Sequence, residues 1–478
     1  MNPKRVYVSQ LPPCYSGVSG DCFPELIAGA KQSPALGALR NLLHLAQLDP
    51  ERFGTAQWNP LGSWLGTGQR FVIKPNWVHH LNASGQGLDC LVTHSSVIEA
   101  VVEYVALTHP SGIIVGDAPI QSCDFVRLLD QSGWNESSAR LSARGIPVEV
   151  RDFRLTTRTD GAWAGDQNTV RSEDDYVRFN LGKESLLEPV SGGHSRFRVT
   201  MYDPKALAET HGPANHQYLV AREILDANVV INLPKLKTHK KAGITGALKN
   251  LVGANGHKSY LPHHRKGSTT AGGDCYAHPR TWRSLGETLL DRANGAEPGI
   301  QKKLYGRAAG AAIRAGRLFD GDFDLEGSWF GNDTVWRMVI DLQRILHYGK
   351  SAGNLSTRQQ RTIVNLTDAI VGGQGEGPLA PEPAALGFLS MGASAAACDW
   401  VHAALMGLDP ERIPLTREAL AALSGGPSGF QSGDIRVCTQ GGDWAVAEAA
   451  RRMGSQLRLP AGWRGHCEAS VAGELTVC

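Results

Sequence analysis

The segment Ile231–His264 holds the side chains of this sequence that are best suited to acid–base chemistry. After an apolar start, INLP, it contains six lysines and four histidines but no Asp or Glu. Glycines and apolar residues are interspersed among the basic ones. The segment is therefore either a solvated basic surface or one wall of an active site. The ten basic residues are Lys235, Lys237, His239, Lys240, Lys241, Lys249, His257, Lys258, His263 and His264.

The spacing within AGITGALKN favours an anion-binding site. Gly243 and Gly246 permit close approach of the backbone, and the residues that follow can begin a helix whose free N–H groups attract a phosphate or a carboxylate. Lys237, Lys249 and the adjacent Asn250 would surround the same anion. A basic loop exposed to solvent is the alternative.

His239 is the candidate for proton transfer. It comes directly after a predicted strand, and an imidazole with an ordinary pKa near 6.5 suits a general acid or base. Asp117 would orient this histidine or bind a divalent metal ion. Lys249 would complete the catalytic group.

Polar residues also end other predicted strands. Lys74 and Asn76 end RFVIKPNWV, Asp117 ends SGIIVGDAP, and Asp368 stands at the start of DAIVGGQGEGP. The carboxyl ends of parallel strands meet along one edge of a sheet, where open α/β proteins bind their ligands. One such strand end is common in α/β proteins. This sequence has four, counting the strand that begins Ile231–His264, and their Lys, Asn, Asp and His residues favour a shared cleft.

Two further regions supply candidates for substrate binding. Asp333 and Arg337 lie four residues apart on one predicted helix face, so that Arg337 would hold a carboxylate or phosphate in bidentate fashion. An intrahelical ion pair is the alternative. The glycine loop GGQGEGP would hold Glu376 in a sharply turned position. This loop lacks both the P-loop pattern and GxGxxG spacing, so it gives little support for a nucleotide.

A divalent metal ion is the cofactor for which the residue types supply ligands. His257, His264 and Asp399 are the candidates, because imidazole and carboxylate groups bind such ions. The spacing HxxxxxHH matches no strong metal motif, and hydrogen bonding by each histidine or helix capping by Asp399 are the alternatives. The nine cysteines form no CxxC pair, which indicates reduced thiols and no disulfide framework.

Length, composition and charge limit the class of protein. A chain of 478 residues predicts two or three domains. A formal net charge of +2 argues against bulk nucleic-acid binding. The sequence has no apolar run of the roughly 18 residues that span a bilayer, and its N-terminus lacks the apolar core of a signal peptide. We expect a cytoplasmic protein with a small anionic substrate; a homo-oligomer is left open.

The elements that must position these residues follow an α/β pattern. Strands at 70–78 and 111–119 flank a helix that begins near residue 95, and this strand–helix–strand order implies a parallel sheet. Further strands are expected at 146–153 and 228–233, a helix before residue 226, and helices at 335–349 and 398–408. We expect mainly parallel sheets flanked by helices in two lobes. The predicted regions are an N-terminal extension (1–69), an α/β domain with the Lys/His loop (70–264), a largely helical insertion (265–345) and a C-terminal α/β region that completes the cleft (346–478).

INLPKLKTH and AGITGALKNLVG resemble the signature of the domain of unknown function 362 family. FVIKPNWV, DAIVGGQGEGP and CDWVHAALMGLDP are similar to other segments of that family, over roughly residues 70–440. GSWFGNDTVWRMVIDLQRIL resembles the longer members, some of which are encoded among polysaccharide-biosynthesis genes. Many relatives carry an Fe–S module with CxxCxxC runs. This chain has no such run, so we expect no Fe–S cluster.

The residues around His239 also resemble the HxxAGxSGGxK stretch of nickel-pincer lactate racemases. The resemblance implies that His239 is an acid/base at a 2-hydroxy acid carbon and that Lys249 anchors a cofactor. It also implies that His257 or His264 is a metal ligand. The sequence has Ala247 and Leu248 where the racemases have a glycine and a variable residue.

Together these features predict an enzyme that binds a hydroxy acid or an acidic or phosphorylated sugar in a cleft between lobes. Proton or hydride transfer, with His239 as acid or base, is the expected reaction. A metal-dependent hydrolase or transferase is one alternative. A ligand-binding or redox-partner protein without catalytic activity is the other.

Overall fold

The computed structural model describes residues 1–17, 23–158, 167–297, 299–319, 324–424 and 429–469. Parts of the predicted insertion (298 and 320–323) and of the predicted C-terminal region (425–428 and 470–478) lie outside the described residues.

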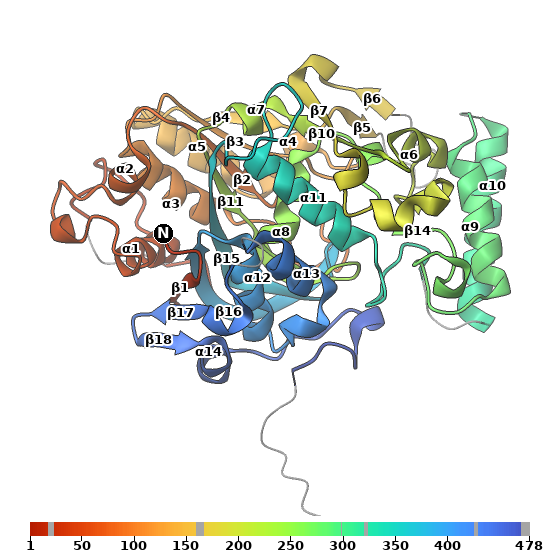
Figure 1. Ribbon diagram of the computed structural model, residues 1–478. Helices are drawn as coiled ribbons and strands as arrows, with labels where there is room; N and C mark the ends of the chain where they lie inside the picture. The colour runs from red at the N-terminus through yellow and green to blue at the C-terminus, as the bar shows by residue number, and fades with distance from the viewer. Residues whose placement is uncertain (18–22, 159–166, 298, 320–323, 425–428, 470–478) are drawn as a thin grey trace, which may run out of the picture.

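One large sheet forms the centre of the protein (Figure 1). Within the described residues it has 11 strands, nine of which form a continuous order while two branch from it. The order is β18 (Gly442–Ala445), β17 (Arg436–Thr439), β1 (Arg5–Gln10), β16 (Ala380–Gly392), β15 (Thr362–Glu376), β11 (Val229–Leu233), β2 (Arg70–Pro75), β3 (Gly112–Asp117) and β4 (Glu149–Asp152); the two branching strands are β12 (Lys235–His239) and β13 (Gly243–Thr245).

The half of the sheet that runs from β15 to β4 is parallel. β15, β11, β2, β3 and β4 pair in parallel, whereas β16 pairs antiparallel with both β1 and β15. The strands β2, β3 and β11 are almost continuous runs of buried residues, which is typical of parallel strands covered on both faces. The predicted class, α/β with a mainly parallel sheet, is therefore confirmed.

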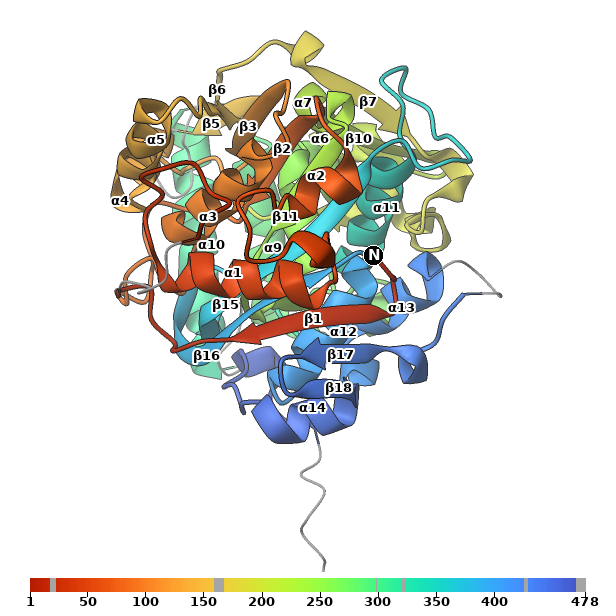
Figure 2. The ribbon, with the colours of Figure 1, turned by 90° about the vertical axis from the view of Figure 1, so that its left-hand side faces the viewer.

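Helices cover both faces of this sheet. α1 (Pro34–Leu45) and α3 (Ser95–Ala106) pack on one face, as Figure 2 shows for α1. α8 (Ala247–Asn250), α11 (Val335–Tyr348), α12 (Ala395–Leu405) and α13 (Pro414–Leu423) cover the other face. Successive side chains of β2 point to opposite faces of the sheet. Phe71 and Ile73 share a core with α1 and α3, and Val72 belongs to the core on the other face.

α9 (Thr281–Asn294) and α10 (Ile300–Phe319) lie side by side at one end of the molecule (Figure 1). Both lie within the range predicted to be a largely helical insertion (265–345). The remaining elements are small and peripheral. They are α2 (Pro60–Leu65), α4 (Phe125–Gln131), α5 (Trp134–Ala143), β5 (Thr156–Arg158), β6 (Gln167–Thr169), β7 (Tyr176–Asn180), β8 (Phe197–Arg198), α6 (Pro204–Thr210), β9 (His211–Gly212), β10 (Asn215–Ala221), α7 (Arg222–Asp226), β14 (His264–Arg265) and α14 (Val446–Met453).

One local prediction is confirmed only in part, and another is wrong. The segment before Asp226 was expected to be helical; Arg222–Asp226 forms α7, but QYLVA before it belongs to β10 because it pairs with β7. The expected glycine loop GGQGEGP is instead the end of β15, paired with β16. Its glycines allow β12 to come close, since a Cβ at Gly373 would lie 2.7 Å from the Cβ of Lys237.

Strands from three of the four predicted regions belong to the one central sheet. β1 comes from residues 1–69, and β15 to β18 come from residues 346–478. None of the helices in the described residues is both long and apolar enough to cross a membrane. The seven cysteines within the described ranges are free thiols.

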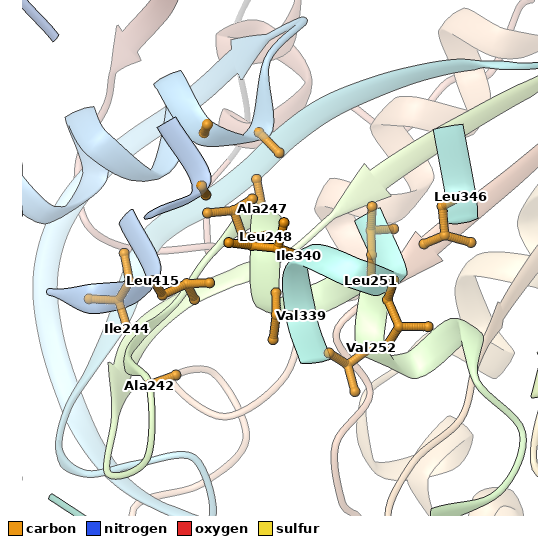
Figure 3. Packing of buried hydrophobic residues seen from close by; sticks show 14 of the residues in the cluster. Ala242, Ile244, Ala247, Leu248, Leu251, Val252, Val339, Ile340, Leu346 and Leu415 are labelled. Atoms are coloured by element: carbon orange, nitrogen blue, oxygen red, sulfur yellow. The ribbon is translucent and has the colours of Figure 1, made fainter. Parts of the chain in front are cut away.

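The apolar residues of AGITGALKNLV anchor this segment to the helices of the second face. Leu248 and Leu251 are fully buried and share a cluster with Val339 and Ile340 of α11. Figure 3 shows this packing, with Ile244 beside Leu415 of α13. The apolar side chains thus fix the backbone from which the lysines of the same segment project.

Replacing Leu248 with Ala should lower the free energy of unfolding by about 2–5 kcal/mol, because it leaves a cavity in this cluster. Urea denaturation followed by circular dichroism measures the change. Leu285→Ala, at a side chain that is 42% exposed on α9, is the control and should change stability by about 0.5 kcal/mol or less. An equal loss in both variants would contradict the anchoring role of Leu248.

Candidate functional site

The parallel strands bring a buried ion pair to the carboxyl edge of the sheet. Lys74 ends β2 and Asp117 ends β3, and their charged groups lie 2.6 Å apart. Asn250 accepts a hydrogen bond from Lys74 Nζ at 3.3 Å. Asp117 also accepts from the backbone N–H of Trp77 at 2.7 Å. Two of the four predicted strand ends therefore meet directly.

Gly253 brings the segment after α8 against this pair. A Cβ at this position would overlap Asp117 Oδ1 and lie 2.8 Å from Lys74 Nζ, so any larger residue would displace the pair. The carbonyl of Gly253 accepts a hydrogen bond from the N–H of Ala118 at 3.0 Å. The segment Ile231–His264, called the signature segment below, thus forms one continuous wall with the ends of β2 and β3.

A cavity of about 300 Å³ opens beside this wall. Its lining combines lysines and histidines with apolar residues, among them Val78, Ile120, Val199 and Leu379. The polar lining residues are Asn76, Asp117, Gln121, Ser122, Arg158, Thr200, Tyr202, Lys237, His239, Lys240, Lys241, Thr245, Lys249, Asn250, Lys258, His263 and Glu326.

Positive charge exceeds negative charge in this lining. Six Lys and Arg side chains face two carboxylates. Asp117 is already paired with Lys74, and Glu326 pairs with Lys240 at 3.0 Å and with Lys241 at 3.3 Å. Among the described residues, Lys249 and Lys258 have no hydrogen bond or ion pair to their ammonium groups. The cavity therefore lacks the negative charge that its lysines require.

Burial makes these lysines easy to deprotonate. It lowers the pKa of Lys237 and of Lys249 to about 7 and the pKa of Lys258 to about 8. Neighbouring cations add to the effect, with Lys235 acting on Lys237, and Lys258 acting on Lys249. An anion in the cavity would reverse these shifts, since it stabilises the charged forms.

Hydrogen bonds fix opposite tautomers in the two histidines that line the cavity. His239 Nδ1 accepts the backbone N–H groups of Lys241 and Ala242, at 3.0 and 3.2 Å, so its proton is on Nε2. His263 Nδ1 lies 2.7 Å from the carbonyl oxygen of Leu261, to which it must donate. Neutral His263 therefore has its lone pair on Nε2. One ring offers a donor and the other an acceptor.

Both histidines are neutral at ordinary pH. Burial lowers the pKa of each well below its usual value, and the Lys249 ammonium adds to the effect on both rings. Protonation of His239 at Nδ1 would also break its two hydrogen bonds to the backbone. His239 is therefore suited to donate a hydrogen bond from Nε2 and is a poor general base.

Several polar atoms of the cavity have no partner. Asn76 Oδ1 and Thr245 Oγ1 are buried without a hydrogen bond in the described part of the chain. The Tyr202 hydroxyl also has no hydrogen bond to any described residue, and burial raises its pKa, so it stays protonated. Buried polar groups normally have a hydrogen-bond partner, so these three groups can bond to a ligand or to water in the cavity.

The backbone N–H groups at the start of α8 are occupied by the protein itself. The amides of Ala247 and Leu248 donate to the carboxylate of Asp399, at 2.6 and 2.9 Å. Asp399 lies inside α12 and not at its start, and it also contacts His402 Nδ1 at 3.0 Å. Gly246 permits this approach, because a Cβ there would lie 2.7 Å from Asp399 Cγ. The anion predicted at these amides is thus a side chain of the same protein.

The structure brings together only some of the predicted site residues. The cavity lining includes His239, Lys249, Asp117, Asn76, Lys237 and Asn250, and Lys74 lies directly behind Asp117. Gly243, Gly246, Asp333, Arg337 and Glu376 are not part of the lining.

Each polar side chain outside the lining has another partner. Arg337 pairs with Asp333 at 3.1 Å, which is the intrahelical ion pair that the sequence left open. Exposed Glu376 accepts from the N–H of Ala461 at 2.8 Å. The roles predicted for these residues in substrate binding stay untested predictions.

His257, His264 and Asp399 do not form a joint metal site. Within the described residues, no three His, Cys, Asp or Glu side chains come close enough to hold a metal ion. His257 Nδ1 instead accepts the N–H of Ser259 at 3.2 Å. His264 Nδ1 is buried without a hydrogen bond to the described chain.

Several lining residues carry no signal in the sequence. Arg158 ends β5, and Tyr202 and Glu326 lie in loops; all three are far from the signature segment along the chain, so nothing in their spacing indicates the cavity. Lys258 and His263 were noted as basic residues of Ile231–His264, but they were not assigned to substrate binding or catalysis. The proline immediately before His263 is a signal that could have selected this histidine, because a proline marks a turn that can direct a side chain inward.

Replacing Lys249 with Met should stabilise the protein more at pH 6 than at pH 9. Because the pKa of Lys249 is about 7 in the folded state and 10.5 ordinarily, the unfolded chain binds more protons between these values, and the parent gains stability as pH rises. The variant lacks this gain. The free energy of unfolding of the variant minus that of the parent should therefore fall by about 1–3 kcal/mol between pH 6 and pH 9. Thermal and urea unfolding at both pH values measure it.

Lys205→Met is the matched control, since Lys205 is exposed on α6. Its effect on stability should be the same at both pH values. A pH-independent effect of Lys249→Met would mean that Lys249 is not a desolvated ammonium group.

Two solved structures resemble this fold weakly. A protein from Thermotoga maritima has 10% identity and a TM-score of 0.29, with 68% of this chain and 51% of that chain covered. The lactate racemase apoprotein from Thermoanaerobacterium thermosaccharolyticum has 10% identity and a TM-score of 0.28, with 82% and 62% covered. The chain thus spans less than two thirds of either protein. None of the curated proteins matches the sequence.

A family of sequences does match. The pattern of the family described as Domain of unknown function (DUF362) fits residues 155–404, from β5 through most of α12. This range contains the complete signature segment with His239, Lys249, Lys258 and His263. It covers more than half of the 478 residues. The chain therefore belongs to the DUF362 family.

Proposed function

We propose that this protein is an enzyme that binds a small anionic molecule in the cavity and transfers a proton at the carbon next to the anionic group. A hydroxy acid or an acidic or phosphorylated sugar fits this description. The excess of lysine over carboxylate in the lining carries the proposal. Lys249 and Lys258 have no partner among the described residues, and a carboxylate or phosphate would neutralise them.

The two histidines support the catalytic part of the proposal. Nε2 of His263 is free to accept a proton, and Nε2–H of His239 can donate a hydrogen bond to an oxygen on which negative charge develops. In a cavity such groups act more strongly than in bulk water, because less water competes with them. His239, expected to be the acid or base, thus becomes the hydrogen-bond donor, while His263 becomes the base.

Other predictions remain open beside this proposal. Hydride transfer, metal-assisted hydrolysis, a link to polysaccharide biosynthesis, a cytoplasmic location and homo-oligomers stay predictions. The division into four regions, in which residues 346–478 complete the cleft, is likewise a proposal. Its support is that Pro378 and Leu379 of the last region line the cavity.

Proton exchange tests the catalytic proposal. Lactate, glycerate, glucuronate and glucose 6-phosphate are incubated with the protein in D₂O, and loss of the C–H signal is followed by NMR. We expect exchange in at least one of these acids, and His263→Gln should slow it by about 100-fold or more. His239→Gln should lower the rate, and His278→Gln, at an exposed histidine outside the lining, should leave it unchanged.

Thermal shift measurements with the same four acids separate binding from catalysis. Stabilisation without exchange would support a binding protein that has no catalytic activity. Neither stabilisation nor exchange with any acid would contradict the proposed function.

A further inference from the structure

Lys249 differs from the other lysines at this edge of the sheet. Lys74 pairs with Asp117, Lys240 and Lys241 pair with Glu326, and Lys237 donates to the carbonyl oxygen of Leu91. Each of these ammonium groups is held by a partner. The Lys249 ammonium has no partner within the described ranges.

Lys258 is the other lysine of the cavity without a partner, but its surroundings differ. The carboxylate of Asp117 acts on Lys258 and favours its charged form. The charges that act on Lys249 are those of Lys258, Lys241 and Lys74, and all three are positive. Electrostatics therefore favour the neutral amine most clearly at Lys249.

The backbone holds Lys249 firmly in this position. It is part of α8, whose first amides are bonded to Asp399 and whose apolar neighbours Leu248 and Leu251 are fully buried. Because its pKa is lowered to about 7, Lys249 supplies the free amine at neutral pH far more readily than an ordinary lysine. A desolvated amine beside other cations is the usual form of a lysine that attacks a carbonyl group.

We propose that Lys249 forms a Schiff base with an anionic substrate that carries a carbonyl group, of which a 2-oxo acid is the smallest form. This inference rests on the proposed function and narrows its substrate class. Lys258 would hold the carboxylate, and His239 Nε2–H would bind the carbonyl oxygen. The cavity of about 300 Å³ suits a small acid, since it is at the lower end of the usual range for ligand pockets.

The step balances without an oxidant or a reductant. The nitrogen lone pair of Lys249 attacks the carbonyl carbon, so that a C–N bond forms. The C–O bond then breaks, and the oxygen leaves as water with one amine hydrogen and one proton from the solvent. The nitrogen keeps one hydrogen and a positive charge. This iminium withdraws electrons from the neighbouring carbon, whose proton then becomes easier to remove, and water reverses the linkage.

Reductive trapping with pyruvate tests the inference. The full-length protein is incubated with pyruvate, reduced with sodium borohydride, and examined by intact mass and peptide mapping. We expect one reduced adduct per chain, located at Lys249 in the unaltered protein. Adduct formation should rise with pH around 7, as Lys249 loses its proton among the cations Lys258, Lys241 and Lys74 and the neutral rings of His239 and His263.

Two variants and one binding measurement complete the test. Lys249→Arg keeps the charge but forms no imine, so it should lose the adduct, and Lys249→Gln should do the same. Lys205→Arg, at an exposed lysine of α6 outside the cavity, should keep it. A main adduct at another lysine would overturn the inference.

Pyruvate binding distinguishes the two proposals. If pyruvate raises the melting temperature of the parent protein without forming an adduct, the Schiff base is wrong and the proposed anion site stands. If pyruvate neither stabilises the protein nor reacts with it, and the four acids of the exchange experiment also fail to bind, both proposals fail.

Discussion

The excess of lysine over carboxylate beside the cavity is the constraint on which this site depends. A buried ammonium group loses its hydration, and each one normally requires a partner. At the carboxyl edge of the sheet, Lys74 and Lys235 have such partners, in Asp117 and Asp368 at 2.6 Å each. Lys249 and Lys258, which are only partly buried, have no such partner within the described chain. The fold thus places uncompensated positive charge beside a cavity, where a ligand can supply the missing negative charge.

The rest of the architecture keeps this arrangement in place. Parallel strands bring Lys74 and Asp117 together, and Gly253 lets the signature segment pack against them. Asp399 reaches from α12 to the first amides of α8, so a single carboxylate connects the two elements. The apolar residues between the glycines bury themselves against α11 and α13. Within the signature segment, the lysines therefore supply charge, the glycines permit close packing, and the apolar residues anchor the backbone.

Much of the fold follows from the sequence, because β2, β3 and β11 are continuous apolar runs with clear ends and α11 is a long amphipathic helix. β10 was mistaken for a helix, since its pairing with β7 is a tertiary contact that periodicity does not reveal. In the site, Lys237, His239 and Lys249 could be selected because they follow a strand within one segment. Tyr202, Arg158 and Glu326 could not, because only the three-dimensional path of segments distant in the chain brings them to the cavity. The sequence also could not predict that Asp399 accepts the hydrogen bonds of the α8 amides, because Asp399 lies about 150 residues later in the chain.

The proton balance of anion binding tests the central claim most directly. Calorimetric titration of lactate into the protein at pH 8, in two buffers with different ionisation enthalpies, gives the number of protons taken up on binding. Lactate does not itself titrate near this pH. Uncompensated lysines predict uptake of up to about one proton, because the bound carboxylate raises the lowered pKa of Lys249 and Lys258. Binding without proton uptake, or proton release, would contradict the account.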